Sequence, residues 1–161
     1  AERQRGDAHP AGPERRERDG VARAALSLGI AEAALAEGLS YVESRRVFGK
    51  KLAEMQNTQM VLADSRMELD AAWLLTLRAA RSLDAGERAG MESSMAKLYA
   101  TETCGRIVDR VLQFHGGYGY SREYAIERHY RDARVTRIYE GASEIQRIVI
   151  ARELLAGAAA S

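Results

Sequence analysis

The fold class is predicted most directly by residues 19–44, which read DGVARAALSLGIAEAALAEGLSYVES. Apolar side chains recur there at steps of three and four residues, at Val21, Ala25, Leu28, Ala31 and Leu35. Side chains at this spacing lie on one face of an α-helix, so the stretch predicts a helix with one buried face. We expect this helix to end near Phe48 and Gly49, because glycine is common just after a helix C-terminus.

The next segment, residues 53–83, carries two apolar stripes. One stripe consists of Met60, Ala63, Met67, Ala71 and Leu74, and the other of Leu62, Leu69, Trp73 and Leu77. At about 100° per residue the two stripes lie on opposite faces of a helix. A helix that is apolar on two sides is buried on two sides, so we expect one of its faces to contact a partner subunit.

Three more helices are predicted downstream, over residues 91–114, over 122–132 and after Glu140. Ser143 and Gln146 fit an S-x-x-Q capping box for the last helix. Its inward face is predicted to consist of Ile145, Ile148, Val149 and Leu155. No stretch alternates convincingly with a period of two residues, so no strand is expected. The prediction is an all-α fold, an antiparallel up-and-down helical bundle of the four-helix type with an additional short helix.

Length and composition set the domain organisation. With 161 residues, of which 46% are hydrophobic, the chain is long enough for one domain with a core. Residues 1–18 contain no large apolar side chain and hold both prolines, so we expect a disordered tail or linker remnant there. The bundle is expected to occupy residues 19–157.

Charge and cysteine content narrow the partners and the location. The formal net charge of +1 provides no overall field for attracting nucleic acid or anionic lipid, so neither partner is expected. The sequence has no apolar run near the roughly 20 residues needed to span a bilayer. A single cysteine, Cys104, excludes an internal disulfide framework and suits a reducing, cytoplasmic location.

Metal and nucleophile chemistry find little support in the sequence. His9, His115 and His129 are scattered and lack the spacing of metal ligands, so no metal site is expected. Cys104 is interpreted as a small core residue, because no histidine lies near it in the sequence. The arginines of residues 127–137 are offset by acidic neighbours, which favours an ion-paired helix face over a nucleic-acid site.

Three clusters remain as candidates for function: residues 45–56 (RRVFGKKLAEMQ), 113–120 (QFHGGYGY) and 139–147 (YEGASEIQR). Taken singly, each has a structural explanation as an ion pair and helix cap, a glycine turn or a helix cap. Glu140 is the least expected residue among them. It lies neither on an obvious solvated helix face nor four residues from a lysine.

Together, in this order, the three clusters resemble the C-terminal domain of the acyl-CoA dehydrogenase family, from about Asp19 to Leu155. The resemblance rests on R-x-x-F-G followed by a glutamine, on Q-x-x-G-G, and on Y-E-G-x-S-x-I-Q. The matching residues of the first two motifs are Arg45, Phe48, Gly49, Gln56, Gln113, Gly116 and Gly117. The family's C-terminal domain is a four-helix-type bundle, which agrees with the helical pattern.

The resemblance implies FAD-dependent α,β-dehydrogenation of an acyl-CoA thioester. Glu140 matches the catalytic base that removes the α-proton while hydride passes to FAD, and Gly141 matches a substrate-binding position. The residues that match cofactor-binding positions, partly across a dimer, are Arg45, Phe48, Gln56, Gln113, Gly116, Gly117, Ala142, Ser143 and Glu144. The resemblance also implies a homodimer or homotetramer, with electron-transfer flavoprotein as the acceptor.

Two departures from the family pattern leave an alternative open. Family members carry a helical domain and a β-domain ahead of this one, so we expect activity to need both of these missing domains. The family also commonly has an Asp-x-x-Arg pair that touches substrate before the first bundle helix, and here the arginine position falls on Gly20. The alternative is a non-catalytic helical oligomerisation module derived from the same family.

Overall fold

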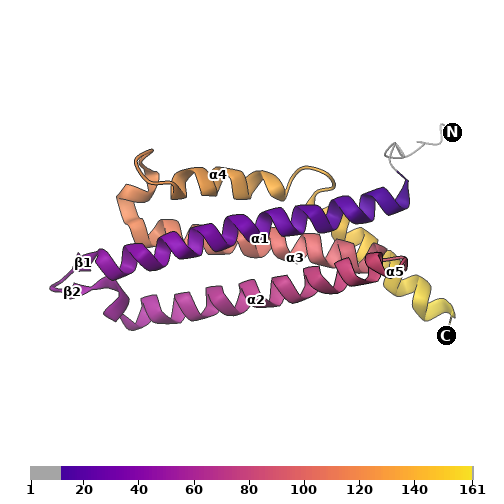
Figure 1. Cartoon of the computed structure of the whole chain (residues 1–161), viewed down its shortest axis with the longest axis horizontal. Coiled ribbons are helices and arrows are strands. Elements are labelled where there is room, and N and C mark those ends of the chain that lie inside the picture. Colours follow the sequence, from indigo (N-terminus) through magenta and orange to yellow (C-terminus); the bar gives the residue numbers. More distant parts are fainter. Residues whose placement is uncertain (1–11, 161) are drawn as a thin grey trace.

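The described part of the chain, residues 12–160 of a computed structural model, is almost entirely helical (Figure 1). The elements in chain order are α1 (Pro13–Ser44), β1 (Arg46–Val47), β2 (Lys50–Lys51), the 3-10 turn η1 (Leu52–Glu54), α2 (Gln56–Asp84), α3 (Gly90–His115), the 3-10 turn η2 (Gly116–Tyr120), α4 (Ile126–Thr136) and α5 (Ser143–Ala160). The predicted all-α bundle is confirmed.

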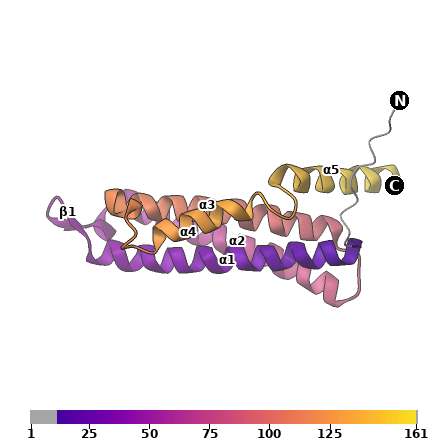
Figure 2. The ribbon, with the colours of Figure 1, turned by 90° about the horizontal axis from the view of Figure 1, so that it is seen from above.

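The three longest helices, α1, α2 and α3, run side by side, and α4 lies along α1 and α3 (Figures 1 and 2). Because the connections are short, α2 runs antiparallel to α1, α3 antiparallel to α2, and α4 antiparallel to α3. Helix α5 begins beside α3 and continues beyond the end of the bundle (Figure 2). The β1–β2 hairpin and η2 therefore lie at one end of the bundle, and the α4–α5 connection lies toward the other.

Small side chains allow α1 and α3 to pack closely at the centre. The residues Ala31 and Ala34 of α1 and Ala96 and Ala100 of α3 are fully buried. A β-carbon added to Gly38 of α1 would lie only 2.8 Å from Cγ2 of Val111, so a larger residue there would push the helices apart.

Helix α1 begins six residues before the predicted boundary at Asp19. Pro13 occupies its first turn, where a missing backbone N–H costs nothing. Glu17 is buried, and its Oε2 accepts the backbone N–H of Ala89 at 3.1 Å. Residues 13–18 of the predicted disordered tail or linker remnant are thus helical and belong to α1. Residues 1–11 of the predicted tail lie outside the described residues.

The predicted C-cap at Gly49 is also wrong. Helix α1 ends at Ser44, and the N–H of its C-cap residue Arg45 donates to the carbonyl of Tyr41 at 2.8 Å. Phe48 (φ 50°) and Gly49 (φ 81°) instead form the two-residue turn between β1 and β2. Positive φ at both positions is typical of a type I′ hairpin turn. Strands of two residues are too short to show an alternating pattern, so the sequence did not predict them.

The start of α5 differs from the predicted capping box. The hydroxyl of Ser143 donates to Oε1 of Glu102 on α3 at 2.7 Å instead of capping its own helix. The predicted inward face is wrong at Ile145, Ile148 and Leu155, which are 50%, 46% and 71% exposed. Apolar spacing marks a face that avoids water, but it does not say whether this chain or another covers that face.

Helix α2 has one buried and one exposed apolar face. Leu69 and Ala72 are fully buried against the bundle, whereas Met60, Met67 and Leu74 are 54%, 65% and 69% exposed. The prediction of two apolar faces is thus confirmed, and the partner subunit on the outer face stays a prediction.

Helix α1 is also long and apolar enough to cross a membrane by length and composition, with a mean hydropathy of 1.2 over its most apolar window. The sequence expectation that no such run exists is therefore wrong on this criterion. The central helix of a bundle passes the same test, and α1 contacts α2, α3 and α4.

Candidate functional site

The loop between α4 and α5 presents Glu140 in an uncommon backbone conformation. Glu140 has a φ of 51° and the following Gly141 a φ of 91°. A left-handed conformation costs a residue with a β-carbon on the order of 1 kcal/mol, so other contacts must hold it. A β-carbon on Gly141 would also lie 2.7 Å from Nε2 of Gln146. Position 141 therefore favours glycine for its conformation, and a side chain there would also displace the flexible end of Gln146.

The ammonium group of Lys97 on α3 holds the backbone of this loop. Its Nζ donates to the carbonyl oxygens of Tyr139 at 2.8 Å, Glu140 at 2.7 Å and Gly141 at 2.5 Å. The Lys97 side chain is only 2% exposed. Burial lowers its pKa to about 8, an effect that the nearby charge of Glu140 opposes.

The carboxylate of Glu140 pairs with Arg23 on α1. An Nη of Arg23 lies 2.8 Å from Oε1 of Glu140, and the two side chains are 33% and 36% exposed. The Arg23 guanidinium also lies 4.9 Å from the ring centroid of Tyr139. The hydrogen bond with Glu140 raises the pKa of Arg23 above its ordinary value.

A second ion pair anchors the beginning of α5. Glu102 accepts hydrogen bonds from Ser143 and pairs with Arg137 at 2.7 Å. Burial opposes ionisation of Glu102, but these two partners outweigh it and lower the pKa of the carboxyl. Ser143 is 7% exposed and its hydroxyl is committed to this contact, whereas Glu144 is exposed to solvent. Ala142 is half-buried, and its carbonyl accepts the N–H of Ile145 at 2.9 Å.

At the opposite end of the bundle, a cavity of about 430 Å³ opens beside the hairpin. The residues that line it include Tyr41, Arg45, Leu52, His115, Gly116 and Gly117. The exposed guanidinium of Arg45 lies 5.4 Å from the ring centroid of Tyr118. An exposed guanidinium beside a cavity can donate paired hydrogen bonds to a phosphate.

The glycine turn after α3 leaves its backbone open to this cavity. Gly116 has a φ of 57°, and a β-carbon added at Gly116 or Gly117 would meet nothing within 4 Å. The carbonyl of Gln113 accepts the N–H of Gly116, and the Gln113 side chain is exposed. Gly119 is different, because a β-carbon there would lie 2.7 Å from the carbonyl oxygen of Leu112. The arrangement, with open glycine backbone beside an exposed guanidinium, fits the diphosphate end of a dinucleotide such as FAD.

Two further predicted cofactor residues lie at the same end of the bundle, and their side chains are exposed. Phe48 is 98% exposed at the tip of the hairpin, and Gln56 is exposed at the first residue of α2. The structure thus gathers Arg45, Phe48, Gln56 and the glycine turn at one end of the bundle.

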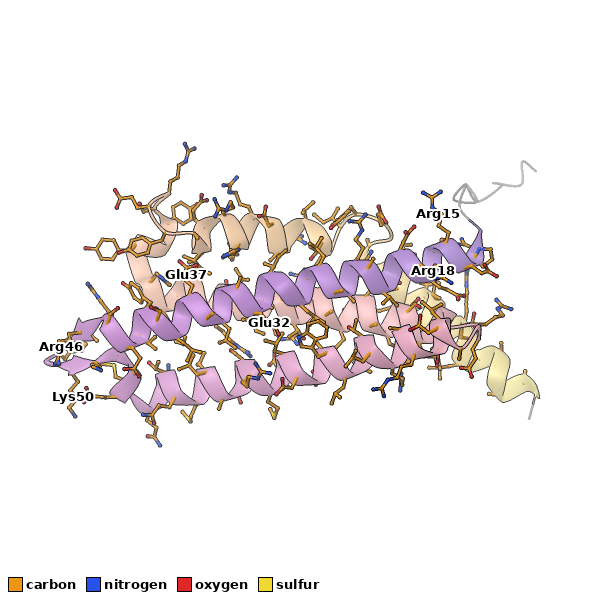
Figure 3. All side chains as sticks on the ribbon, in the orientation of Figure 1. Arg15, Arg18, Glu32, Glu37, Arg46 and Lys50 are labelled. Carbon is orange, nitrogen blue, oxygen red and sulfur yellow. The ribbon has the colours of Figure 1, made fainter. Side chains whose placement is uncertain are left out.

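Glu140 does not join this group within one copy. Its partner Arg23 precedes the end of α1 by 21 residues, which corresponds to about 32 Å along the helix at 1.5 Å per residue. Figure 3 labels Arg15 and Arg18 near one end of α1, and Arg46 and Lys50 in the hairpin at the other end. The predicted base and the predicted dinucleotide residues therefore lie far apart within a single copy.

Sequence reasoning missed Lys97 and left Arg23 unassigned. Lysine occurs only at positions 50, 51 and 97, and Lys97 is the one within a long predicted helix. A lysine on the buried face of a helix could have been recognised from its spacing to Ala96, Ala100 and Cys104. No sequence pattern signalled which backbone carbonyls it would meet.

Other candidate chemistry is weak in the described residues. Cys104 is fully buried, and burial raises the pKa of its thiol to about 12, which suits the predicted core role. Within residues 12–160 no group of three or more His, Cys, Asp or Glu side chains could hold a metal ion. On α4, Arg131 pairs with Glu127 at 3.1 Å, as expected for an ion-paired face.

Comparisons with known proteins identify the family. The family model for the acyl-CoA dehydrogenase C-terminal domain matches residues 17–155. The chain is 50% identical over 132 residues to 3-(aryl)acrylate reductase of Clostridium sporogenes, covering 82% of this chain and 35% of the relative. It is 46% identical over 132 residues to the caffeyl-CoA reductase–Etf complex subunit CarC of Acetobacterium woodii, with the same two coverages of 82% and 35%.

Solved structures agree with these relatives. Butyryl-CoA dehydrogenase from Megasphaera elsdenii superposes with a TM-score of 0.85 at 40% identity, covering 87% of this chain and 37% of that one. The chain spans about a third of the length of the curated relatives it matches. The match runs through most of the described helices and includes all three motif clusters. The chain therefore belongs to the acyl-CoA dehydrogenase family and corresponds to the C-terminal domain of that family.

Proposed function

We propose that the chain supplies the catalytic base of an FAD-dependent enzyme that removes hydrogens from the α- and β-carbons of an acyl-CoA thioester. The observation that carries the proposal is the Glu140 loop. A family-typical carboxylate lies there on an exposed, left-handed turn whose backbone is held by a buried lysine. A base fixed in this way loses little freedom when substrate binds, which favours proton removal.

In the proposed reaction, Glu140 takes the proton from the carbon next to the thioester carbonyl. The Arg23–Glu140 ion pair holds the carboxylate in one place before substrate arrives. Arg23 is partly exposed and on a different helix, so it can turn aside when the acyl chain reaches the loop. Gly141 carries no side chain that would block the approach of the thioester to Glu140.

FAD is the proposed cofactor, and when bound it supplies the acceptor for the hydride that leaves the β-carbon. Arg45 and the open backbone of Gly116 and Gly117 are proposed to hold its diphosphate and adenine end. Ala142, Ser143 and Glu144, which follow the Glu140 loop, are proposed to lie near the cofactor at that end of the bundle. Because the two sites lie about 32 Å apart along α1, each complete site would take residues from two copies of the chain.

The direction of the reaction depends on the substrate. Two relatives are named reductases, and one solved neighbour is a dehydrogenase. The same carboxylate serves both directions, because a base that removes the α-proton from a saturated thioester returns it as an acid to an unsaturated one. We propose dehydrogenation as the forward reaction, with electron-transfer flavoprotein as the acceptor, a homodimer or homotetramer as the assembly, and the cytoplasm as the location.

The test uses the protein completed with the domains that its relatives carry. In a Glu140→Gln variant, the rate of flavin reduction by acyl-CoA should fall by about a thousandfold or more while FAD content stays unchanged. Asp109→Asn, at an exposed position on α3, is the matched control and should behave as wild type. Wild-type reduction by the Glu140→Gln protein would refute the assignment of the base.

A second candidate is a non-catalytic helical oligomerisation module. The exposed apolar stripe of α2, with Met60, Met67 and Leu74, favours it, because such a face is typical of a subunit contact. This candidate predicts a stable oligomer without bound flavin. Measuring flavin absorbance and sedimentation on the same preparation separates the two functions, since bound FAD would rule out the module.

A further inference from the structure

Lys97 is the largest fully buried side chain in the described part of the chain. The other two lysines, Lys50 and Lys51, lie in the short hairpin strand β2. Among the described residues no carboxylate forms an ion pair with Lys97. Burying an ammonium group without a direct ion pair is costly, so its three hydrogen bonds must compensate for lost water.

The three acceptors are consecutive carbonyls, those of Tyr139, Glu140 and Gly141. In an extended backbone, successive carbonyls point in opposite directions, and three in a row do not converge on one donor. Here they converge because Glu140 and Gly141 both have positive φ. An ammonium group has three N–H donors, so it can bond all three carbonyls of this loop at once, which it could not do if the loop were extended.

The loop is fixed on its other sides by weaker contacts. Gln146 donates to the carbonyl of Gly141 at 3.1 Å, and the N–H of Ser143 donates to the carbonyl of Arg137 at 3.3 Å. Neither contact touches the carbonyl of Glu140 itself. Lys97 is thus the contact that reaches the backbone of the proposed base directly, while Arg23 reaches its carboxylate.

We propose that Lys97 is a positioning residue, which holds three carbonyls of the loop so that Glu140 presents its carboxylate at a fixed place for the α-proton. The proposal rests on the proposed function of Glu140. It assigns no contact between Lys97 and the substrate: the ammonium lies beneath the loop, and it acts through the backbone.

The first test is kinetic and uses the full-length, flavin-loaded protein. Replacing Lys97 by glutamine leaves two N–H donors, and replacing it by methionine leaves none at similar length. We expect kcat to fall in the order Lys, Gln, Met, by about tenfold or more for Lys97→Met, with KM changed much less. The deuterium isotope effect with α-deuterated substrate should grow in the same order, because a displaced base makes proton removal more rate-limiting.

The second test needs no activity. Hydrogen–deuterium exchange of the peptide covering residues 137–146 in the full-length protein should accelerate in Lys97→Gln and Lys97→Met. Val108→Ala, also on α3 and fully buried, is the matched control. It should lower thermal stability without changing exchange of the loop or the isotope effect.

The outcomes separate the two proposals. Wild-type kcat, isotope effect and loop exchange in Lys97→Gln would overturn the positioning role even if Lys97→Met did not fold. If Glu140→Gln retained activity, the proposed function would fail, while loop exchange would still decide whether Lys97 holds the loop. If Val108→Ala changed the loop as much as Lys97→Gln, the effect would reflect general destabilisation, and the proposal would be wrong.

Discussion

The two ends of the bundle differ in how completely this chain builds them. At the Glu140 loop, the backbone is held by Lys97 and the carboxylate by Arg23, all within one copy. At the hairpin end, Phe48, Gln56 and Gln113 have exposed side chains, and Arg45, Gly116 and Gly117 line a cavity. The contacts of the first region lie within this chain, whereas these side chains of the second region are exposed. The chain thus prepares its proposed base internally and leaves the proposed dinucleotide site to be completed.

The largest expected effect concerns the buried charge that supports the first region. Because burial lowers the pKa of Lys97 from 10.5 to about 8, the unfolded chain binds more protons than the folded one between these values. The free energy of unfolding should therefore rise with pH between about 8 and 10.5, by up to roughly 3 kcal/mol. Below about pH 8 both states are protonated and this gain is absent.

Urea denaturation at pH 7.5 and pH 10 measures the change. Lys97→Met should lose this rise, and Lys51→Met, with its lysine in the hairpin and paired with Glu43, should keep it. Two charged groups act on Lys97: the Glu140 carboxylate raises its pKa and the Arg23 guanidinium lowers it. An identical pH dependence in Lys97→Met and wild type would mean that Lys97 does not cause the rise, and would contradict the view that its buried ammonium group supports the loop.

A substitution at Gly141 should break the same region from the backbone side. Gly141→Ala places a β-carbon at a φ of 91° and 2.7 Å from Nε2 of Gln146. We expect it to lower the free energy of unfolding by about 2 kcal/mol and to reduce kcat. Thermal denaturation and flavin reduction measure the two effects. Gly157→Ala, in α5 with open space around its β-carbon, is the control.

A substitution at the hairpin end should change the affinity for the cofactor instead of the stability of the fold. Arg45 caps α1 through its backbone N–H, which Arg45→Gln keeps, and the guanidinium that is removed is exposed, so stability should change little. The affinity for FAD should fall by about tenfold or more, because a charge-assisted hydrogen bond to phosphate is lost. Fluorescence titration of the full-length apoprotein with FAD measures the loss. Unchanged affinity would mean that this end does not hold the cofactor.

The smallest effect is expected for the surface partner of Glu140. Arg23→Gln removes an ion pair whose two side chains are about a third exposed, and such pairs contribute less than about 1 kcal/mol. Thermal denaturation at low and high salt should show a small loss that disappears as salt screens the wild-type pair. A loss of several kcal/mol would place Arg23 among the residues that support the loop.

The helices could be predicted from the sequence because their apolar spacing reflects local geometry. The ends of the elements were less predictable. Helix α1 begins at Pro13, and in its first turns Glu17 accepts the N–H of Ala89, which is 72 residues away in sequence. Ser143 does not cap its own helix as predicted, because its hydroxyl donates to Glu102 on another helix. These are contacts between distant residues, and no local pattern contains them.

The site residues divide in the same way. The motifs around Arg45, Gly116 and Glu140 were recognisable as clusters, and the structure gathers the first two beside one cavity. The motifs did not predict the hairpin turn that exposes Phe48 or the Arg23–Glu140 pair. Their roles toward substrate and cofactor stay predictions until the variants above are measured.

The sequence by itself determined the helical class, the buried stripe of each long helix and the family of the chain, because apolar spacing and short motifs are local properties. Tertiary structure alone decided which carbonyls Lys97 meets, which guanidinium pairs with Glu140, and which apolar faces stay uncovered. The reason is physical: a hydrogen bond or an ion pair depends on positions in space, and packing brings residues such as Lys97 and Glu140 together across 43 positions of sequence.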